Sequence, residues 1–242
     1  ACPVEPVAPR SVFAPALPED WTAQEMAGVD LGDERLNARA QSMLAQRWQR
    51  PTCSFYRSFD TPTQASLAYK LVENPRCEIS LESLLAPHQL QTARRMAAEK
   101  VVLLAQDTTG LSYNTLQQTE GLGSIGERGS RGLFLHTLLA FRLDGIPLGT
   151  AWAEVWARPA QSDTARRNEQ SCDEKESARW VRALQAASQR AQQMPQTMVL
   201  VCGDRESDLY ELYDQKQAAP ANLQVLVRGL ELLDGSGRIA IN

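Results

Sequence analysis

Two aspartates each follow a short run of apolar residues, and this arrangement could hold a metal ion. The runs are VVLLAQD at 101–107 and MVLVCGD at 198–204, which end at Asp107 and Asp204. Runs that are apolar on both faces are typical of parallel strands inside a sheet, whose carboxyl ends form a common ligand-binding edge. Neighbouring strands lie about 4.8 Å apart, so two carboxylates there could share one Mg²⁺ with substrate phosphate oxygens. The predicted chemistry is metal-assisted phosphoryl transfer on nucleic acid.

A second interpretation of the two aspartates is that they only shape turns. An aspartate after a strand often caps a turn or the following helix. The acidic residues that come next, Glu206 and Asp208, are interpreted as favouring the first turn of a helix through its dipole. The equivalent placement of Asp107 and Asp204 on two buried strands favours the metal site, and the turn interpretation stays open for each.

The segment VDLGDERLNARA at 29–40 is a candidate DNA-contacting helix. Arg35 and Arg39 are four residues apart and share one face of that helix, whereas Asn37 lies on a different side. Exposed arginines contact phosphates or the edges of guanine bases. A solvated face, with the preceding acidic residues as ion-pair partners, explains the same pattern equally well.

Other features that suggest chemistry are assigned structural roles. Gly121, Gly123 and Gly126 match the dinucleotide fingerprint GxGxxG, but that motif must follow a strand and open a helix. Polar residues flank it here, so we interpret it as a glycine-rich loop beside Asp107. His136 lies inside an expected strand and is interpreted as structural. Core packing is the expected role of three tryptophans: Trp152, Trp156 and Trp180.

Periodicity and cap residues predict that the first part of the chain is helical. Residues 1–20 form a flexible leader without periodicity, and residues 21–99 form a helical region. Its helices are expected at about 33–49, from Thr61-Pro62 to Asn74, and from Ser80 to 98, with Pro87 kinking or dividing the last.

The pattern changes to alternating strands and helices over 100–242. Strands are expected at 101–107, 132–143, 146–157, 198–204 and 223–229, with helices beginning near 171 and 209. The first of these helices carries Trp180, Leu184, Ala187 and Ala191 on one apolar stripe. Asp144-Gly145 predicts a hairpin between the second and third strands, and Ser171 with Glu174 fits a capping box. The fold class predicted is α/β, a mixed sheet flanked by helices, preceded by an all-helical region.

Composition excludes several classes of protein. Hydrophobic residues make up 43% and charged residues 22% of the 242 residues, which argues against disorder. No apolar run approaches the ~20 residues of a membrane span, and no signal peptide is visible. Five scattered cysteines without CxxC favour free cytosolic thiols, and hence a cytoplasmic protein. The net charge of −4 names no partner.

Several motifs occur together in the order found in one known family. They are LGDERLNAR, AYKLVEN, QDTTGLSY, a GLG, RG and H stretch, DGIPLG, EKESARW and GDRESDLYEL. On these motifs, which extend from about Trp21 to Arg228, the chain resembles bacterial cut-and-paste DDE transposases. The resemblance is to the insertion-sequence-four family and its transposon-Tn-five type.

The resemblance implies a fold, a reaction and partners. It implies a ribonuclease-H-like catalytic domain in which Asp107 and Asp204 are the first two carboxylates of a triad that binds Mg²⁺ or Mn²⁺. It implies a homodimer that binds double-stranded DNA, both transposon ends and target, for cleavage and strand transfer. The positions that match DNA-contacting or metal-adjacent motifs are Arg35, Asn37, Arg39, Thr108, Thr109 and Arg205.

The sequence departs from the family pattern at two places. Tyr69-Lys70-Leu71 stands where the family has YRF, and no match to YxxRxxxExxxK supplies the third carboxylate before Asn242. Glu231 lies too near the last expected strand for that role. We therefore expect a partial transposase, incomplete at its C-terminus, with little or no strand-transfer activity.

Three functional hypotheses follow. The first is a transposase, and the second is a catalytically inactive remnant that still binds DNA or dimerises. The third is a structure-selective nuclease with two metal ions, which the helical N-terminal region with its LGDERLNAR segment disfavours.

Overall fold

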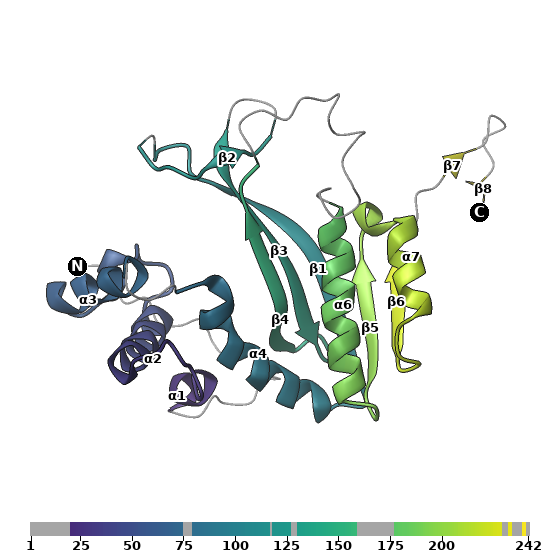
Figure 1. The fold of residues 1–242 in the computed structure, drawn as a ribbon, viewed down its shortest axis with the longest axis horizontal. Coiled ribbons are helices and arrows are strands. Elements are labelled where there is room, and N and C mark those ends of the chain that lie inside the picture. The colour runs from purple at the N-terminus through teal and green to yellow at the C-terminus, as the bar shows by residue number, and fades with distance from the viewer. Residues whose placement is uncertain are drawn as a thin grey trace. The chain divides into compact units, whose positions relative to one another are not determined.

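The chain divides into two compact units, Ala1–Gln91 and Thr92–Asn242, which are described separately (Figure 1). The structure is a computed structural model. It describes residues 20–74, 79–116, 118–126, 130–158, 177–228, 232–233 and 239–240. Within these residues, no helix combines the length and the apolar character that crossing a bilayer requires. Residues 1–19 of the expected leader and the expected capping box at 171–174 lie outside the described residues.

The described part of the first unit is helical, as predicted. Its elements are α1 (Trp21–Glu25), α2 (Glu34–Gln49), the 3₁₀ turn η1 (Tyr56–Ser58), α3 (Pro62–Val72) and the start of α4 (Leu81–Ala97). Two apolar clusters hold them together, one around Leu36, Ala40 and Leu71 and the other around Phe59, Ala65 and Ala68. The apolar stripe of α2 packs inward through Leu36, Ala40, Met43 and Leu44, whereas Trp48 near the end of the helix is 50% exposed.

Side-chain caps fix where α2 and α3 begin. The Asp33 carboxylate accepts a hydrogen bond from the backbone N–H of Arg35 at 2.7 Å. Thr61 and Gln64 form a reciprocal capping box, with proline in the first turn of α3. A cap of this kind contributes about 1 kcal/mol to the stability of its helix. Because each cap joins residues within one turn, the local sequence predicts where these two helices begin.

Of the two effects expected of Pro87, kinking or dividing its helix, division is wrong. α4 runs continuously from Leu81 to Ala97 with Pro87 inside it. A proline removes one N–H donor and crowds the preceding turn. The helix continues because its two ends are held in apolar clusters, Leu84 in that of the first unit and Met96 in that of the second.

The second unit is built on a mixed sheet, which confirms the predicted α/β class. The strands are β1 (Val101–Ser112), β2 (Gly123–Ser124), β3 (Arg131–Phe141), β4 (Pro147–Trp156), β5 (Met198–Gly203) and β6 (Leu223–Val227), with a separate short pair β7 (Leu232–Leu233) and β8 (Ile239–Ala240). The order along the sheet is β3-β1-β5-β6, and both β2 and β4 pair with the outer side of β3. β1, β3 and β4 pair antiparallel, whereas β5 runs parallel to β1 and to β6.

β1 is longer than the sequence predicted. It continues past Asp107 to Ser112 because its antiparallel pairing with β3 extends to Ser112 opposite Gly132. The parallel pairing with β5 ends earlier, at Ala105 opposite Cys202. The residues of β1 beyond Asp107 are mostly exposed. The apolar run in the sequence therefore ends at 107, before the strand does. Asp107 therefore lies inside β1, at the level where β5 ends.

Two predicted turns have different outcomes. The Asp144-Gly145 hairpin between β3 and β4 is confirmed, with φ +84° at Gly145 and a 3.3 Å hydrogen bond from the Ile146 N–H to the Asp144 carboxylate. The glycine-rich segment is not only a loop, because Gly123 and Ser124 pair with β3 as β2. The close packing there needs glycine: a Cβ on Gly123 would lie 2.2 Å from the backbone oxygen of Arg158.

One face of the sheet carries the core. α6 (Ala178–Gln193) lies over this face, followed in the chain by β5, the 3₁₀ turn η3 (Arg205–Ser207) and α7 (Tyr210–Gln217) (Figure 1). The residues predicted for the apolar stripe of α6 are all buried: Trp180, Leu184, Ala187 and Ala191. On the other face, apolar side chains stay partly exposed, including Leu139 at 37%, Met198 at 50% and Leu226 at 59%.

Candidate metal and DNA site

Asp107 and Asp204 occupy matching positions on neighbouring parallel strands. Each lies two residues beyond the last paired position, Ala105 opposite Cys202. Val102, Leu104 and Gln106 of β1 are buried under α6, as are Val199 and Val201 of β5. Because side chains alternate along a strand, both aspartates belong to the opposite, open face, and both are exposed.

Backbone groups orient one oxygen of each carboxylate. The Thr108 N–H donates to Asp107 Oδ1 at 2.8 Å, and the Glu206 N–H donates to Asp204 Oδ1 at 2.9 Å. Asp204 thereby caps η3, so the turn interpretation also describes it. Within the described residues, neither Oδ2 has a hydrogen bond, which leaves one oxygen of each carboxylate for a ligand.

The donor set fits a hard cation that keeps other ligands. Mg²⁺ is usually bound by one or two carboxylates, with water and phosphate oxygens completing its shell. Two exposed aspartates on adjacent strands match that requirement. In the described part of the chain, no group of three or more His, Cys, Asp or Glu residues could hold a metal ion. Within the described residues, the candidate ligands are therefore Asp107 and Asp204.

A tight turn holds Asp204 in place. Ser207 is fully buried, and its hydroxyl donates to the backbone oxygen of Asp204 at 2.6 Å. A Cβ on Gly203 would lie 2.2 Å from that hydroxyl oxygen and 3.4 Å from the ring of Trp180. Only glycine at 203 lets η3 fold this closely against the end of β5, a constraint that the motif GDRES did not reveal.

The other predicted residues of this region lie on different sides of the sheet. Thr109 is exposed on the same face as Asp107, and Arg205 is exposed in η3 directly after Asp204. Thr108 belongs to the opposite face, where its hydroxyl lies 2.7 Å from Nδ1 of His136. The structure thus brings Thr109 and Arg205 near the aspartates and turns the Thr108 side chain toward the core.

His136 has a more specific environment than the sequence indicated. It is fully buried on β3 between Trp152 and Trp180, whose ring centroids are 5.9 Å and 4.7 Å from its own. Burial lowers the pKa of His136 to about 4, although the nearby carboxylates of Asp107 and Glu154 raise it. The imidazole is therefore neutral at neutral pH.

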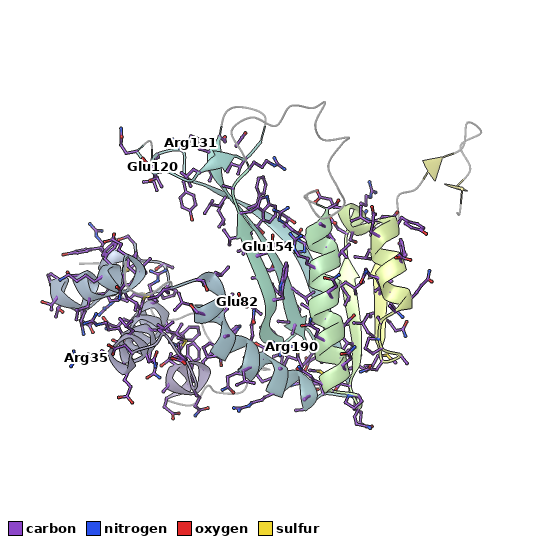
Figure 2. All side chains as sticks on the ribbon, in the orientation of Figure 1. Arg35, Glu82, Glu120, Arg131, Glu154 and Arg190 are labelled. Atoms are coloured by element: carbon purple, nitrogen blue, oxygen red, sulfur yellow. The ribbon has the colours of Figure 1, made fainter. Side chains whose placement is uncertain are left out.

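Ion pairs join α6 to β4 beside His136. Glu154 stands opposite His136 in the register and accepts hydrogen bonds from Arg182 at 2.7 Å and 2.9 Å, while Arg179 Nε lies 3.1 Å from the same carboxylate as an ion pair (Figure 2). The Arg179 guanidinium also lies 3.6 Å from the ring centroid of Trp156, which stacks on Phe134. These contacts fix the start of α6, which carries Trp180.

In the helical unit, the three predicted residues have different surroundings. Arg35 is exposed and points outward from α2 (Figure 2), and Arg39 is half-buried. Asn37 has a structural contact, because its side-chain oxygen accepts from the Leu31 N–H at 2.8 Å. Among the described residues, neither arginine forms an ion pair, and the Asp33 carboxylate caps α2 instead.

Sequence reasoning missed a second exposed group near η1 and α3. Tyr56 is 52% exposed and Tyr69 is 41% exposed. Arg57 and Lys70 follow them directly, and within the described residues their charged ends make no hydrogen bond or ion pair. Leu71 is fully buried, so only the first two residues of Tyr69-Lys70-Leu71 could touch a ligand. Alternating aromatic and basic residues were the signal for this surface.

Comparison with known proteins identifies a class of domain in the first unit. Residues 18–77 match a family model described as "Transposase DNA-binding". This region of the chain is therefore similar to the DNA-binding domain of transposases, and it contains α1, α2, η1 and α3.

Two solved structures give weak matches over a larger part of the chain. They are "Crystal structure of the Mos1 Strand Transfer Complex", at 12% identity and a TM-score of 0.24, and "Crystal structure of a pre-cleavage Mos1 transpososome", at 11% and 0.25. Each match covers 77% of this chain, and the chain spans 57% and 58% of the two matched chains. TM-scores of this size do not establish a common fold.

Proposed function

We propose that this chain is a DDE transposase of the insertion-sequence-four family, transposon-Tn-five type. Residues 21–99 bind transposon ends, and residues 100–242 form a ribonuclease-H-like domain that cleaves DNA and transfers strands. The observation that carries the proposal is the matching position of Asp107 and Asp204 on two parallel strands, in a chain whose residues 18–77 match a transposase DNA-binding domain.

The strand order supports the catalytic half of the proposal. Three antiparallel strands, β1, β3 and β4, are followed by a helix and by two parallel strands, β5 and β6, that extend the sheet on the β1 side. The ribonuclease-H-like arrangement implied by the family resemblance has this sequence of elements. It places the carboxyl end of β5 beside the middle of β1, where both aspartates lie.

The mechanism assigns separate roles to the residues around the aspartates. Asp107 and Asp204 would hold the Mg²⁺ or Mn²⁺, which when bound would activate the attacking oxygen and stabilise the leaving oxygen of a phosphodiester. The N–H groups of Thr108 and Glu206 keep one oxygen of each carboxylate in place. The exposed Arg205 offsets the charge of an approaching phosphate.

The DNA-binding half rests on cations of α2 that have no ion-pair partner among the described residues. Arg35 and Arg39 of α2 contact phosphates, while Asn37 holds the loop before α2 through Leu31. Because duplex DNA presents a dense row of phosphates, log affinity falls with log salt, and each such contact makes this fall steeper by about 0.9. The transposase acts as a homodimer that joins two DNA ends.

Selection from a random duplex library tests end recognition. We expect one sequence to be enriched, and we expect Arg35→Ala with Arg39→Ala to lower the salt slope by about 1.8. Arg190→Ala is the control, because Arg190 lies on α6 and its guanidinium hydrogen-bonds only to Gln193 among the described residues. Equal binding of all sequences would show that end recognition is wrong.

Plasmid nicking and metal binding test the catalytic half. We expect Asp107→Ala and Asp204→Ala each to abolish Mg²⁺-dependent nicking and to weaken Mn²⁺ binding, measured from the electron paramagnetic resonance signal of free Mn²⁺. Asp214→Ala is the control, because Asp214 is an exposed aspartate of α7. Nicking that persists in both aspartate variants removes these residues from the mechanism.

An inactive DNA-binding remnant is the second candidate function. The observation that favours it is that the described residues contain no three-ligand metal group. Sequence-selective DNA binding without nicking in either Mg²⁺ or Mn²⁺ identifies this case, and it leaves the role of Arg35 and Arg39 unchanged.

A further inference from the structure

Two polar side chains are buried on the face of the sheet that α6 covers, and packing alone does not explain why polar residues occupy these positions. His136 is fully buried and Gln106 is 4% exposed, and both belong to the face of the sheet that α6 covers. His136 Nε2 and both side-chain amide atoms of Gln106 have no hydrogen-bond partner among the described residues. Burying unpaired polar atoms costs free energy, and apolar residues would fill this space without that cost.

Among the described residues, the imidazole of His136 makes one hydrogen bond, and this bond leads to the candidate metal site. His136 Nδ1 lies 2.7 Å from the Thr108 hydroxyl, and His136 stands directly opposite Thr108 in the register of β1 and β3. The backbone N–H of the same threonine donates to Asp107 Oδ1 at 2.8 Å. Holding the Thr108 side chain on one face of β1 therefore fixes the peptide from which the Asp107 carboxylate is oriented on the other face.

The same histidine reaches the second aspartate through Trp180. The rings of His136 and Trp180 meet edge to face, with centroids 4.7 Å apart. Trp180 also lies against Gly203, the residue before Asp204, because a Cβ built there would be 3.4 Å from the indole. The buried side chains of His136 and Trp180 thus pack together beneath β1 and β5, the two strands that lead to Asp107 and Asp204.

We propose that His136 is a positioning residue, which acts through the Thr108 hydroxyl to hold the Asp107 carboxylate in the orientation that binds a divalent cation. The proposal rests on the proposed function, since it takes Asp107 and Asp204 as the cation ligands. It assigns a task to a residue that touches neither cation nor DNA, and it explains why a histidine occupies a fully buried position of β3.

Mn²⁺ binding to the full chain tests the proposal without requiring catalysis. Outer-shell partners of metal ligands typically affect metal affinity by about 10–100-fold, so we expect Thr108→Val and His136→Leu each to weaken Mn²⁺ binding by about 10-fold. Both variants remove the hydrogen bond between the Thr108 hydroxyl and His136. The double variant should therefore bind Mn²⁺ no more weakly than the single variant with the lower affinity. His136→Asn keeps a polar atom near the position of Nδ1 and should recover most of the loss.

Two further measurements separate positioning from a merely structural role. Leu138→Ala removes a fully buried side chain on the same face of β3, two residues from His136, so it lowers stability without touching the link. We expect this control to bind Mn²⁺ as the wild type does below its unfolding temperature. The chain has two histidines, so nitrogen NMR can follow His136, and Thr108→Val should change the proton distribution of its ring.

Each outcome distinguishes this inference from the proposed function. If Asp107→Ala and Asp204→Ala bind Mn²⁺ as the wild type does, the proposed function itself fails. If those variants lose Mn²⁺ but Thr108→Val and His136→Leu do not, the positioning role is overturned and the proposed function stands. If Leu138→Ala weakens binding as much as His136→Leu, the effect is one of stability and the role is also overturned. Should His136→Leu not fold, Thr108→Val decides alone, because Thr108 is only half-buried.

Discussion

Gly203→Ala tests whether the turn after β5 is as tightly constrained as the structure shows. The added Cβ would lie 2.2 Å from Ser207 Oγ, about 1.2 Å closer than the 3.4 Å at which ordinary contact begins. Ser207 cannot move aside freely, because it is fully buried and its hydroxyl donates to the Asp204 backbone oxygen at 2.6 Å. Overpacking typically costs about 1–3 kcal/mol, and the lack of room to relax favours the upper end.

Thermal unfolding followed by circular dichroism measures this cost. For a unit of this size, each kcal/mol shifts the midpoint by about 2–4 °C, so Gly203→Ala should unfold about 6–12 °C below the wild type. Gly110→Ala in β1 is the matched control. The nearest atom to its added Cβ is a ring carbon of Phe134 at 3.8 Å, so we expect a gain of up to about 1 kcal/mol from the less flexible backbone.

A second substitution identifies the atoms that clash. Ser207→Gly removes the hydroxyl and the Cβ that meet the new methyl group. Ser207→Gly should therefore lower the free energy of unfolding less in the Gly203→Ala variant than in the wild type. In both cases it also removes the hydrogen bond to Asp204. If Gly203→Ala is as stable as Gly110→Ala, or if the two changes at 203 and 207 simply add, the packing argument for this turn is refuted.

Three further predictions concern stability. Leu138→Ala should cost about 2–5 kcal/mol in chemical unfolding, and Leu139→Ala on the 37% exposed side of the same strand should cost clearly less; equal costs would show that the open face is buried. Thr61→Ala should destabilise the helical unit by about 1 kcal/mol in the same assay, and no change would show that the capping box does not stabilise α3. Because the pKa of His136 is lowered from 6.5 to about 4, the unfolded chain binds the extra proton as pH falls through this window. The wild type should therefore lose about 3 kcal/mol more than His136→Asn between pH 6.5 and 4, and parallel pH profiles would contradict this.

Local sequence signals predicted elements more reliably than they predicted where strands end. The cap at Thr61, the hairpin at Asp144-Gly145 and the buried stripe of α6 depend on neighbours within one turn or one helix, and all three are confirmed. The end of β1 depends on β3, a partner distant in sequence, so the apolar pattern placed it five residues too early. Pro87 likewise stays inside α4 because of tertiary contacts at both ends of the helix.

In the candidate site, too, the sequence predicted what has a local signal and missed what depends on contacts between distant residues. Asp107 and Asp204 were visible because each follows an apolar run, and the parallel pairing of those runs is confirmed. The support beneath them was not visible, because His136 and Thr108 are 28 positions apart and meet only through strand register. Gly203 carries no local signal either, since its constraint comes from the fold of the turn back onto Ser207.

The net charge of −4 left the partner undetermined, and the pairing of the cations explains why. In the α/β unit, Arg142 pairs with Glu99 and Asp144, and Arg182 pairs with Glu154, so these charges are already compensated within the fold. In the described residues of the helical unit, Arg50 is compensated by Asp60, but Arg35, Arg39, Arg57 and Lys70 have no such partner. A phosphate backbone is attracted by local, uncompensated charge within about 10 Å, so the overall sign of the protein does not oppose DNA binding by this unit. The proposal accordingly predicts that neutralising these four cations abolishes DNA binding, whereas neutralising Arg142 and Arg182 leaves it intact.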